Sequence, residues 1–395
     1  MVVPSPAPGG ARASRADGIY DRIGVRTIIN GRGATTAVGG TLMPAEVIAA
    51  MAEASKSFVV LDELNQAVGR KIAELTGAED GYVTSGSAAG MALAAAACIT
   101  GSDPDRVYAL PVVTDGRNEI IVHRAHRLNY DQMYRAAGGS IVEIGELDRT
   151  LPEELERAIG PRTAALAYHD SPNCTDGALD FATCVDMAHR HGIPVIVDAA
   201  STLPPVDHLR RWIRWGADLV IYSGGKGIRG PQDAGLLAGR ADLIAAARVN
   251  GRPNAAVRRG MKASKEAMAG LWVALDLFMS ADHEQELRFH TAQAERMRSM
   301  LSSRTDLRCA IEADWEQWPA PVVRIFPVAC AWQPEAVRIA LIDSEPSIHL
   351  NVEHGGLMIN THCLREEEDV IIARRLAEFL DQDAAPSAGL STLRS

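Results

Sequence analysis

The chain has 395 residues, of which 47% are hydrophobic and 5% aromatic, and its formal net charge is −10. This length is enough for one large domain and a smaller one. The negative charge argues against broad nucleic-acid binding, which needs clustered cations, and no apolar run reaches the roughly 18 residues that would predict a membrane-spanning helix.

Residues 1–18 are rich in Pro, Ala, Gly and Ser, and we expect them to form a disordered leader. From residue 19 to residue 250, strand-like and helix-like segments alternate. This alternation predicts a large α/β domain, whose mostly parallel sheet carries helices on both faces. The expected strands are 82–83, 119–123, 140–144, 163–168, 193–197, 218–222 and 234–238, and the expected helices are 43–56, 61–76, 91–99, 151–159, 181–191 and 206–215.

The pattern changes near residue 241. Helical spacing is found at 243–249 and 265–290, and the second of these is long enough to bridge two domains. The remaining expected elements are strands 322–326, 348–352 and 357–360 and a terminal helix over 366–381. We therefore expect a smaller α+β domain at 251–383 and a disordered tail at 384–395.

Asp198 and Lys226 each follow an apolar, strand-like run, and Lys226 is flanked by glycines. Pyridoxal phosphate requires such a pair, because a lysine amine forms a Schiff base with its aldehyde and a carboxylate keeps its pyridine nitrogen protonated. Either feature alone is more often an ordinary strand end or a surface turn. Together, on successive strands of an α/β sheet, they predict a pyridoxal-phosphate site.

A loop for the cofactor phosphate is expected upstream. Ser85, Gly86 and Ser87 follow a short strand and precede an Ala-rich helix. The N-terminus of that helix would face the anion, and the loop offers hydroxyls and backbone N–H groups. Without the Asp198 and Lys226 pair, the simpler interpretation is a Ser-capped turn.

Four segments resemble a known family: 26–31 with Gly39 and Gly40, 84–89, 197–201, and 223–227 with 230–232. On these residues the chain resembles the fold-type I pyridoxal-phosphate enzymes. It is most similar to the selenocysteine synthase-like group, which includes L-seryl-tRNA selenium transferases and D-glucosaminate-6-phosphate ammonia-lyases. The resemblance spans roughly residues 20–380. It implies a large domain with a seven-stranded-type, mostly parallel sheet and a smaller C-terminal α+β domain.

The resemblance also implies roles for individual residues. Lys226 would bind the cofactor and then transfer protons, and Asp198 would pair with the pyridine nitrogen. Cofactor binding would involve Ser85, Gly86, Ser87, Ser201 and Ser223. His126 would stack on the cofactor ring and take part in catalysis, although His123, three residues away, is an alternative for this position.

Cations are expected on the substrate side, because an amino acid brings a carboxylate and a sugar phosphate brings a phosphate. The candidates are Arg32, Arg258, Arg259, Lys262 and Arg365, of which Arg32 lies in the N-terminal motif. For each of the others a solvated surface charge is the simpler interpretation. His169 follows a predicted strand and is expected at the rim of the site, where a turn is an equal alternative. His354 and His362 are weaker candidates, and no HxH or HExxH spacing predicts a metal site.

The resemblance favours an enzyme that acts at the α-carbon of an amino acid or amino sugar acid, with elimination and ammonia release. Racemases and aldolase-like enzymes share the first chemical step, so the sequence does not separate them from lyases. Selenium transfer to seryl-tRNA is less favoured, because we expect no tRNA-binding domain in the short segment before Arg26. A non-catalytic, cofactor-binding role is disfavoured by the intact Lys226 and Asp198.

The expected partners are a small-molecule substrate and a second copy of the chain, without nucleic acid or membrane. Enzymes of this fold build the active site at a subunit interface, so the resemblance implies at least a homodimer. The six cysteines form no CxxC pair, and scattered thiols fit a reducing cytoplasm.

Overall fold

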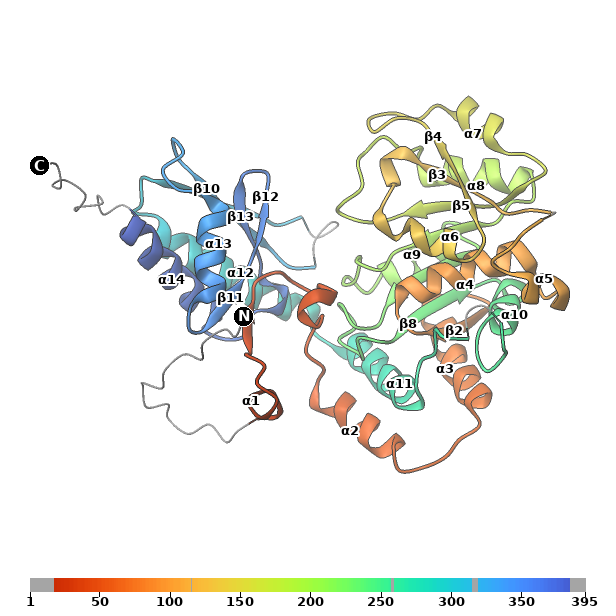
Figure 1. Cartoon of the computed structure of the whole chain (residues 1–395), viewed down its shortest axis with the longest axis horizontal. Helices are drawn as coiled ribbons and strands as arrows, with labels where there is room; N and C mark the ends of the chain where they lie inside the picture. Colours follow the sequence, from red (N-terminus) through yellow and green to blue (C-terminus); the bar gives the residue numbers. More distant parts are fainter. Residues whose placement is uncertain (1–17, 115, 257–258, 315–318, 384–395) are drawn as a thin grey trace, which may run out of the picture.

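The computed structural model describes residues 18–114, 116–256, 259–314 and 319–383. Two sheet-containing bodies stand side by side and are joined by N-terminal segments and by the helices after residue 265 (Figure 1). The larger body carries a seven-stranded sheet, and the smaller body a four-stranded one. Among the described residues, no helix combines the length and the apolar character needed to cross a membrane.

The large sheet has the strand order β2-β8-β7-β6-β5-β3-β4. Strands β3 to β7 run parallel to one another, while β8 is antiparallel to both of its neighbours. The central strands are buried along their whole length, as parallel strands covered on both faces must be. The strands are β2 (Asp80–Thr84), β3 (Glu119–His123), β4 (Ser140–Ile144), β5 (Thr163–His169), β6 (Val195–Asp198), β7 (Leu219–Ser223) and β8 (Gly235–Gly239).

Helices cover both faces of this sheet. One face packs against α4 (Ser87–Thr100) and α10 (Ala241–Asn250), and the other against α3 (Leu61–Thr76), α8 (Phe181–Arg190) and α11 (Lys265–Ser280). Gly90 lets α4 approach the sheet closely, because a Cβ atom there would lie 2.9 Å from Ile221 Cγ2. The other helices of this body are α2 (Ala45–Ala54), α5 (Pro104–Ala109), α6 (Gln132–Ala136), α7 (Pro152–Ala158) and α9 (His208–Arg214), with short 3-10 turns η1 (Thr36–Val38), η2 (Arg124–His126) and η3 (Asn129–Asp131).

The smaller body is an antiparallel sheet of order β12-β13-β10-β9, covered by helices on one side. Its strands are β9 (Leu307–Glu312), β10 (Val322–Pro327), β12 (Asn351–Glu353) and β13 (Gly356–Asn360), and its helices are α12 (His283–Leu301), α13 (Pro334–Asp343) and α14 (Glu368–Asp383), with the turn η4 (Thr361–Cys363). The N-terminal strand β1 (Ile28–Asn30), which follows α1 (Ile19–Arg22), pairs in parallel with β11 (Ser347–His349). The N-terminal strand therefore packs on the smaller body, and residues 31–36, which follow it, lie between the smaller and the larger body.

The predicted fold class is confirmed, but two predictions of local structure were wrong and four elements were not predicted. The expected single helix over 265–290 is two helices, α11 and α12, because the Asp282 side chain accepts a hydrogen bond from the Gln285 N–H at 2.8 Å and starts a new helix. The expected strand 348–352 is divided between β11 and β12 at Leu350. Strand β9 and helices α5, α6 and α13 were not predicted.

The domain limits at residues 250 and 251 stay a proposal. Two observations differ from these limits. The buried side chains of α11, which follows residue 250, belong to the core of the larger body, and Ile29 of β1 belongs to the core of the smaller body. The proposed leader and tail fall, except for Gly18, outside the described residues.

Candidate active site

A cavity of about 760 Å³ lies where the two bodies meet. The larger body contributes the carboxyl ends of its parallel strands and the loop before α4, and the smaller body contributes β12, β13 and η4. Many of the site residues predicted from the sequence line it: Arg32, Ser85, Gly86, Ser87, Asp198, Ser201, Ser223 and Lys226. The sequence motifs thus converge in one place, at the edge of the sheet where α/β enzymes bind their ligands.

Lys226 lies in the loop after β7, and its Nζ atom is 3.0 Å from Ser201 Oγ. Burial lowers the pKa of this lysine, and the nearby carboxylate of Asp198 opposes that shift without cancelling it. The backbone of the loop is held from the N-terminal segment, because the Thr41 hydroxyl donates to the Lys226 carbonyl at 2.9 Å. A fixed lysine with a lowered pKa is suited to react as a nucleophilic amine.

Asp198 is the last residue of β6 and is 8% exposed. Its Oδ1 accepts a hydrogen bond from the Ala200 N–H at 3.1 Å, which fixes the carboxylate at the floor of the cavity. A carboxylate in a largely buried position can stabilise a protonated ring nitrogen, because the low local dielectric strengthens the ion pair.

The loop between β2 and α4 forms another wall. Gly86 has φ +82° and ψ 167°, a conformation that only glycine adopts readily. A Cβ atom at Gly86 would find nothing within 4 Å, so the loop backbone borders open space. The first N–H groups of the 14-residue helix α4 have no partners within the helix, and they give this wall a partial positive charge.

His126 and His169 lie close to each other behind the cavity, and neither is among the residues that line it. The His169 N–H donates to His126 Nδ1 at 3.3 Å, and the His126 ring meets Tyr168 edge to face, with centroids 4.4 Å apart. Burial, together with the neighbouring His123 and His169, lowers the pKa of His126 to about 3. The roles predicted for His126 and His169 stay predictions.

Of the arginines and the lysine predicted to bind the substrate, one lines the cavity and others do not. Arg32 lines the cavity, and its Nε donates to Asn351 Oδ1 at 2.8 Å. Arg365 is paired with Glu368 outside the cavity, and Arg259 and Lys262 are exposed residues that do not line it. Arg258 lies outside the described residues.

Several lining residues were not predicted from the sequence, because the smaller body or the N-terminal loop brings them in. They include Thr35, Asn351, Glu353, Met358 and Asn360. Tyr130, in η3 of the larger body, also lines the cavity and was not predicted. His362, a weak candidate in the sequence, also lines the cavity, and burial lowers its pKa to about 4. For Asn360 the sequence does contain a weak indication of a site residue, because Asn360 is the polar last residue of an apolar strand, as Asp198 is.

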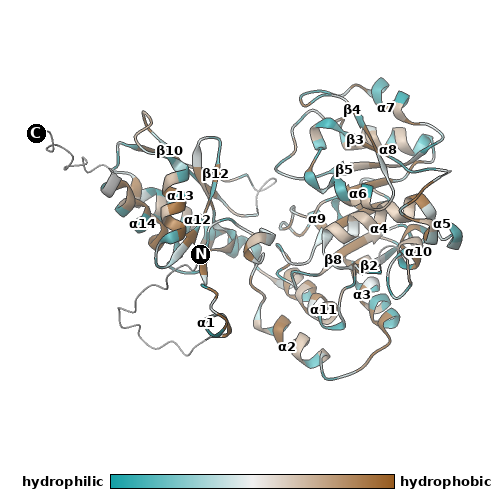
Figure 2. Cartoon of the chain, in the orientation of Figure 1, coloured by the Kyte–Doolittle hydropathy of each residue, from teal (hydrophilic) through white to brown (hydrophobic). Residues whose placement is uncertain are grey.

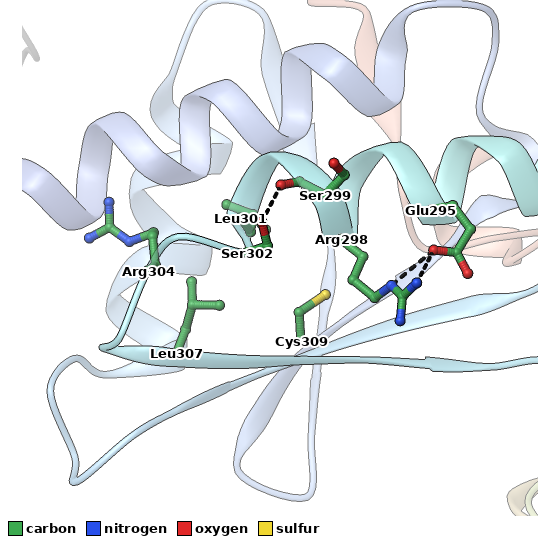
Figure 3. Close-up of a pocket in the computed structure, with 8 residues that line it drawn as sticks. All are labelled: Glu295, Arg298, Ser299, Leu301, Ser302, Arg304, Leu307 and Cys309. Carbon is green, nitrogen blue, oxygen red and sulfur yellow. Dashed lines mark hydrogen bonds and ion pairs between the residues drawn. The ribbon is translucent and has the colours of Figure 1, made fainter.

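A second cavity, of about 440 Å³, lies on the smaller body between α12 and β9 (Figure 3). Its arginines are already engaged, Arg298 by Glu295 and Arg304 by Asp306 and Asp381. Burial raises the pKa of Cys309, so its thiol is protonated at neutral pH. This cavity lacks the reactive groups of the first. In the described part of the chain, no three His, Cys, Asp or Glu side chains gather as a metal site would require.

Comparisons with known proteins identify the family of the chain. The family described as Cys/Met metabolism PLP-dependent enzyme matches residues 62–250. The chain is 34% identical to 5'-C-glycyluridine monooxygenase-decarboxylase from a Streptomyces species, with 93% of this chain and 94% of that protein covered. It is 33% identical to D-glucosaminate-6-phosphate ammonia lyase from Salmonella typhimurium, with 93% and 99% covered.

The solved structure of a D-glucosaminate-6-phosphate ammonia-lyase matches with a TM-score of 0.81 and 32% identity, over 94% of this chain and all of that one. This chain belongs to the pyridoxal-phosphate-dependent enzymes of fold type I. The predicted family, fold class and cofactor are therefore confirmed. A cysteine desulfurase from Escherichia coli, at 18% identity and a TM-score of 0.55, shares the fold; 89% of this chain and 97% of that one are covered.

The residues of the cavity fit pyridoxal phosphate on three separate observations. A partly buried lysine with a lowered pKa lines the cavity, a largely buried carboxylate lines it too, and a glycine loop at a helix N-terminus borders open space. These provide an amine for the aldehyde, an anion for the ring nitrogen and N–H donors for the phosphate.

Proposed function

We propose that the chain is a pyridoxal-phosphate-dependent lyase that removes ammonia from an amino acid or amino sugar acid by α,β-elimination. The single observation that carries the proposal is the placement of Lys226, with its lowered pKa, in one cavity with Asp198 and the Gly86 loop. The similarity to an ammonia lyase over nearly the whole of both chains supports the choice of reaction.

The cofactor, when bound, supplies an aldehyde that takes up an amine and a ring that withdraws electrons from the α-carbon. In the proposal Lys226 Nζ holds the cofactor and then moves the α-proton, which its lowered pKa favours near neutral pH. Ser201 accepts a hydrogen bond from Nζ and so fixes the direction of the amine. Asp198 keeps the ring nitrogen protonated, and the Gly86 loop holds the phosphate with backbone N–H groups.

Arg32 is proposed to bind the substrate carboxylate. Its backbone N–H donates to Asn30 Oδ1 at 3.0 Å and its Nε donates to Asn351, so both ends of the residue are positioned. In the described structure no hydrogen bond or ion pair engages its two Nη groups. A guanidinium held by one nitrogen still presents a fork of N–H donors to a carboxylate.

The experiment that tests the proposal is an absorbance spectrum of the purified holoenzyme before and after borohydride, with mass mapping of the reduced protein. We expect a Schiff-base band that borohydride abolishes and an adduct on Lys226. Screening of amino acids and amino sugar acids for ammonia and keto-acid release follows. A Lys226→Ala variant that keeps full activity would rule out the assignment.

A second candidate is favoured by the 34% identity to the monooxygenase-decarboxylase. In that case the α-carboxylate would leave as carbon dioxide with consumption of oxygen. Parallel measurement of ammonia, carbon dioxide and dissolved oxygen during one turnover experiment separates the two reactions. Racemisation gives none of these products, and it is recognised by a separate measurement of solvent-hydrogen incorporation at the α-carbon.

We also propose that the enzyme is a cytoplasmic homodimer or higher homo-oligomer. Each of the six cysteines is free, as expected in a reducing compartment.

Apolar side chains that a monomer would expose gather in the segment from Leu42 to Val60, and Figure 2 colours much of α2 as hydrophobic. Phe58, in this segment, is fully exposed.

A further inference from the structure

The loop between β2 and α4, which lines the cavity with Ser85, Gly86 and Ser87, is held on its inner side by a buried hydroxyl group. Thr84, the last residue of β2, is 1% exposed and is not among the lining residues. Its Oγ1 donates a hydrogen bond to the Gly86 carbonyl at 2.8 Å. The same carbonyl accepts from the Gly90 N–H at 3.2 Å, as the first hydrogen bond of α4. Both lone pairs of the Gly86 oxygen are therefore occupied.

These two bonds fix the direction of the peptide unit between Gly86 and Ser87. In a trans peptide the C=O and N–H bonds point in opposite directions. Because the Gly86 carbonyl is turned inward, towards Thr84 and α4, the Ser87 N–H is turned outward. Ser87 is the first residue of α4, so this N–H has no partner within the helix, and Ser87 lines the cavity. The N–H is thus directed to a ligand rather than to the protein.

The start of β8 leaves the space that this arrangement needs. Gly235, the first residue of β8, pairs with Thr84 across the two antiparallel strands. A Cβ atom at Gly235 would lie 2.6 Å from the Gly86 carbonyl carbon and 2.7 Å from Thr84 Oγ1. Any side chain at this position would displace the loop or break the hydrogen bond from Thr84.

The end of β2 is also braced from the other side, by α3. β2 is the edge strand of the large sheet, and the Asn65 side chain binds the backbone of Val83. Asn65 Oδ1 accepts from the Val83 N–H at 3.0 Å, and Asn65 Nδ2 donates to the Val83 carbonyl at 3.1 Å. Asn65 therefore supplies both bonds that a further strand would supply at this residue, and Thr84 follows directly from a fixed backbone.

We propose that Thr84 is a positioning residue for the cofactor phosphate: its buried hydroxyl holds the Gly86 carbonyl and thereby directs the Ser87 N–H at the phosphate. The inference rests on the proposed function, in which the Gly86 loop holds that phosphate, and it adds a residue that acts on the phosphate only through the loop. A role in packing alone would be met by valine, which has nearly the same shape and suits a strand.

The test compares two ligands that differ in the phosphate, pyridoxal phosphate and pyridoxal, on the full-length protein freed of cofactor. Both ligands carry the aldehyde for Lys226, so the ratio of their dissociation constants reports the phosphate site. We expect Thr84→Val to lower the preference for pyridoxal phosphate about three- to tenfold, the effect of one hydrogen bond, and to leave the dissociation constant of pyridoxal unchanged. Thr84→Ser keeps the hydroxyl and should keep the preference.

Thr76→Val is the matched control. Thr76 is also buried and its hydroxyl donates to the Ile72 carbonyl at 2.7 Å, but this bond lies within α3 and Thr76 is not among the lining residues. This variant should lose stability in urea and keep the ligand preference. If Thr84→Val does not fold, Thr84→Ser and Thr84→Ala make the same comparison, because those two side chains differ only in the hydroxyl.

The outcomes separate the inference from the proposed function. An unchanged preference in Thr84→Val, or an equal loss of affinity for both ligands, would overturn the inference and leave the proposed function in place. A wild-type protein that binds pyridoxal as tightly as pyridoxal phosphate would overturn both the inference and the proposed role of the Gly86 loop.

Discussion

The Nζ atom of Lys226 lies 3.0 Å from the Oγ atom of Ser201. The two residues follow neighbouring parallel strands, Ser201 three residues after the end of β6 and Lys226 three residues after the end of β7. The serine oxygen accepts a hydrogen bond from the amine and so stabilises its charged form. In the cofactor-free protein this interaction works against burial, which lowers the pKa of the lysine.

Ser201→Ala is therefore predicted to lower the pKa of Lys226 further. The neutral fraction of the amine at pH 7 rises, and cofactor capture by the apoenzyme should be faster by a factor of about 10, which corresponds to the lower end of the range for a hydrogen bond to a charged group. Stopped-flow absorbance across a range of pH measures this rate. Thr41→Ala is the control, because Thr41 bonds only the Lys226 and Gly225 carbonyls of this loop. A slower capture in Ser201→Ala would contradict the prediction.

Gly86→Ala is predicted to weaken cofactor binding at least about tenfold and to cost about 1–3 kcal/mol of stability, because its φ of +82° is unfavourable for any residue with a Cβ atom. Gly77→Ala is a matched control. Gly77 has φ +76° at the end of α3, and a Cβ atom there also finds nothing within 4 Å. We expect both variants to lose stability in urea, but only Gly86→Ala to lose cofactor affinity in a fluorescence titration. Equal affinities would show that this loop does not hold the phosphate.

The sequence was sufficient to predict that Asp198 and Lys226 lie together at one end of the large sheet, where they line the cavity. Asp198 and Lys226 follow continuous apolar runs, and a buried parallel strand is the simplest structure for such a run. Because parallel strands end at the same sheet edge, residues placed just beyond them meet without any further information. This is why the positions of Asp198, Lys226 and Ser85 relative to one another could be expected from the order of segments.

The opposite wall was not predictable in this way. Asn351, Glu353 and Asn360 lie on short strands of the smaller body, and only the packing of that body against the larger one brings them to the cavity. The break between α11 and α12 was missed for a related reason. Its signal is a single capping aspartate, Asp282, within a long run of helix-forming residues.

Arg32→Ala is predicted to raise the dissociation constant of an amino acid ligand by about 10- to 100-fold, which corresponds to about 1.5–3 kcal/mol for a hydrogen bond to a charged group. Arg32→Lys keeps the charge but loses the fork, and it should fall between the wild type and Arg32→Ala. Arg365→Ala is the control, since Arg365 is paired with Glu368 and does not line the cavity. Spectral titration of each holoenzyme checks the order. A larger effect from Arg365→Ala would reverse the assignment.

Acid should destabilise the protein through its buried histidines. Burial, with His169 nearby, lowers the pKa of His123 to about 4, whereas a histidine in the unfolded chain titrates near about 6.5. Between these values the unfolded state binds more protons than the folded state, so the free energy of unfolding falls as the pH falls. The loss is up to about 1.4 kcal/mol per pH unit for each such group, and the contribution is complete above pH 6.5. Urea unfolding at several pH values measures the slope.

His123→Gln removes one of these groups and is predicted to make the slope shallower between pH 6.5 and pH 4. An unchanged slope in His123→Gln would mean that His123 does not titrate differently in the folded and unfolded states.

Phe58→Asp is predicted to convert the proposed homodimer into monomers. Phe58 is fully exposed and lies with Ile48, Val59 and Val60 in an apolar segment, and a charge at the centre of a buried interface would be desolvated without a partner. Light scattering of the purified protein over a range of concentrations gives the mass. Val112→Asp is the control, because Val112 is 65% exposed but lies outside the segment from Leu42 to Val60. A wild-type protein that is already monomeric and active, or a Phe58→Asp variant that stays dimeric, would show that this segment is not the interface.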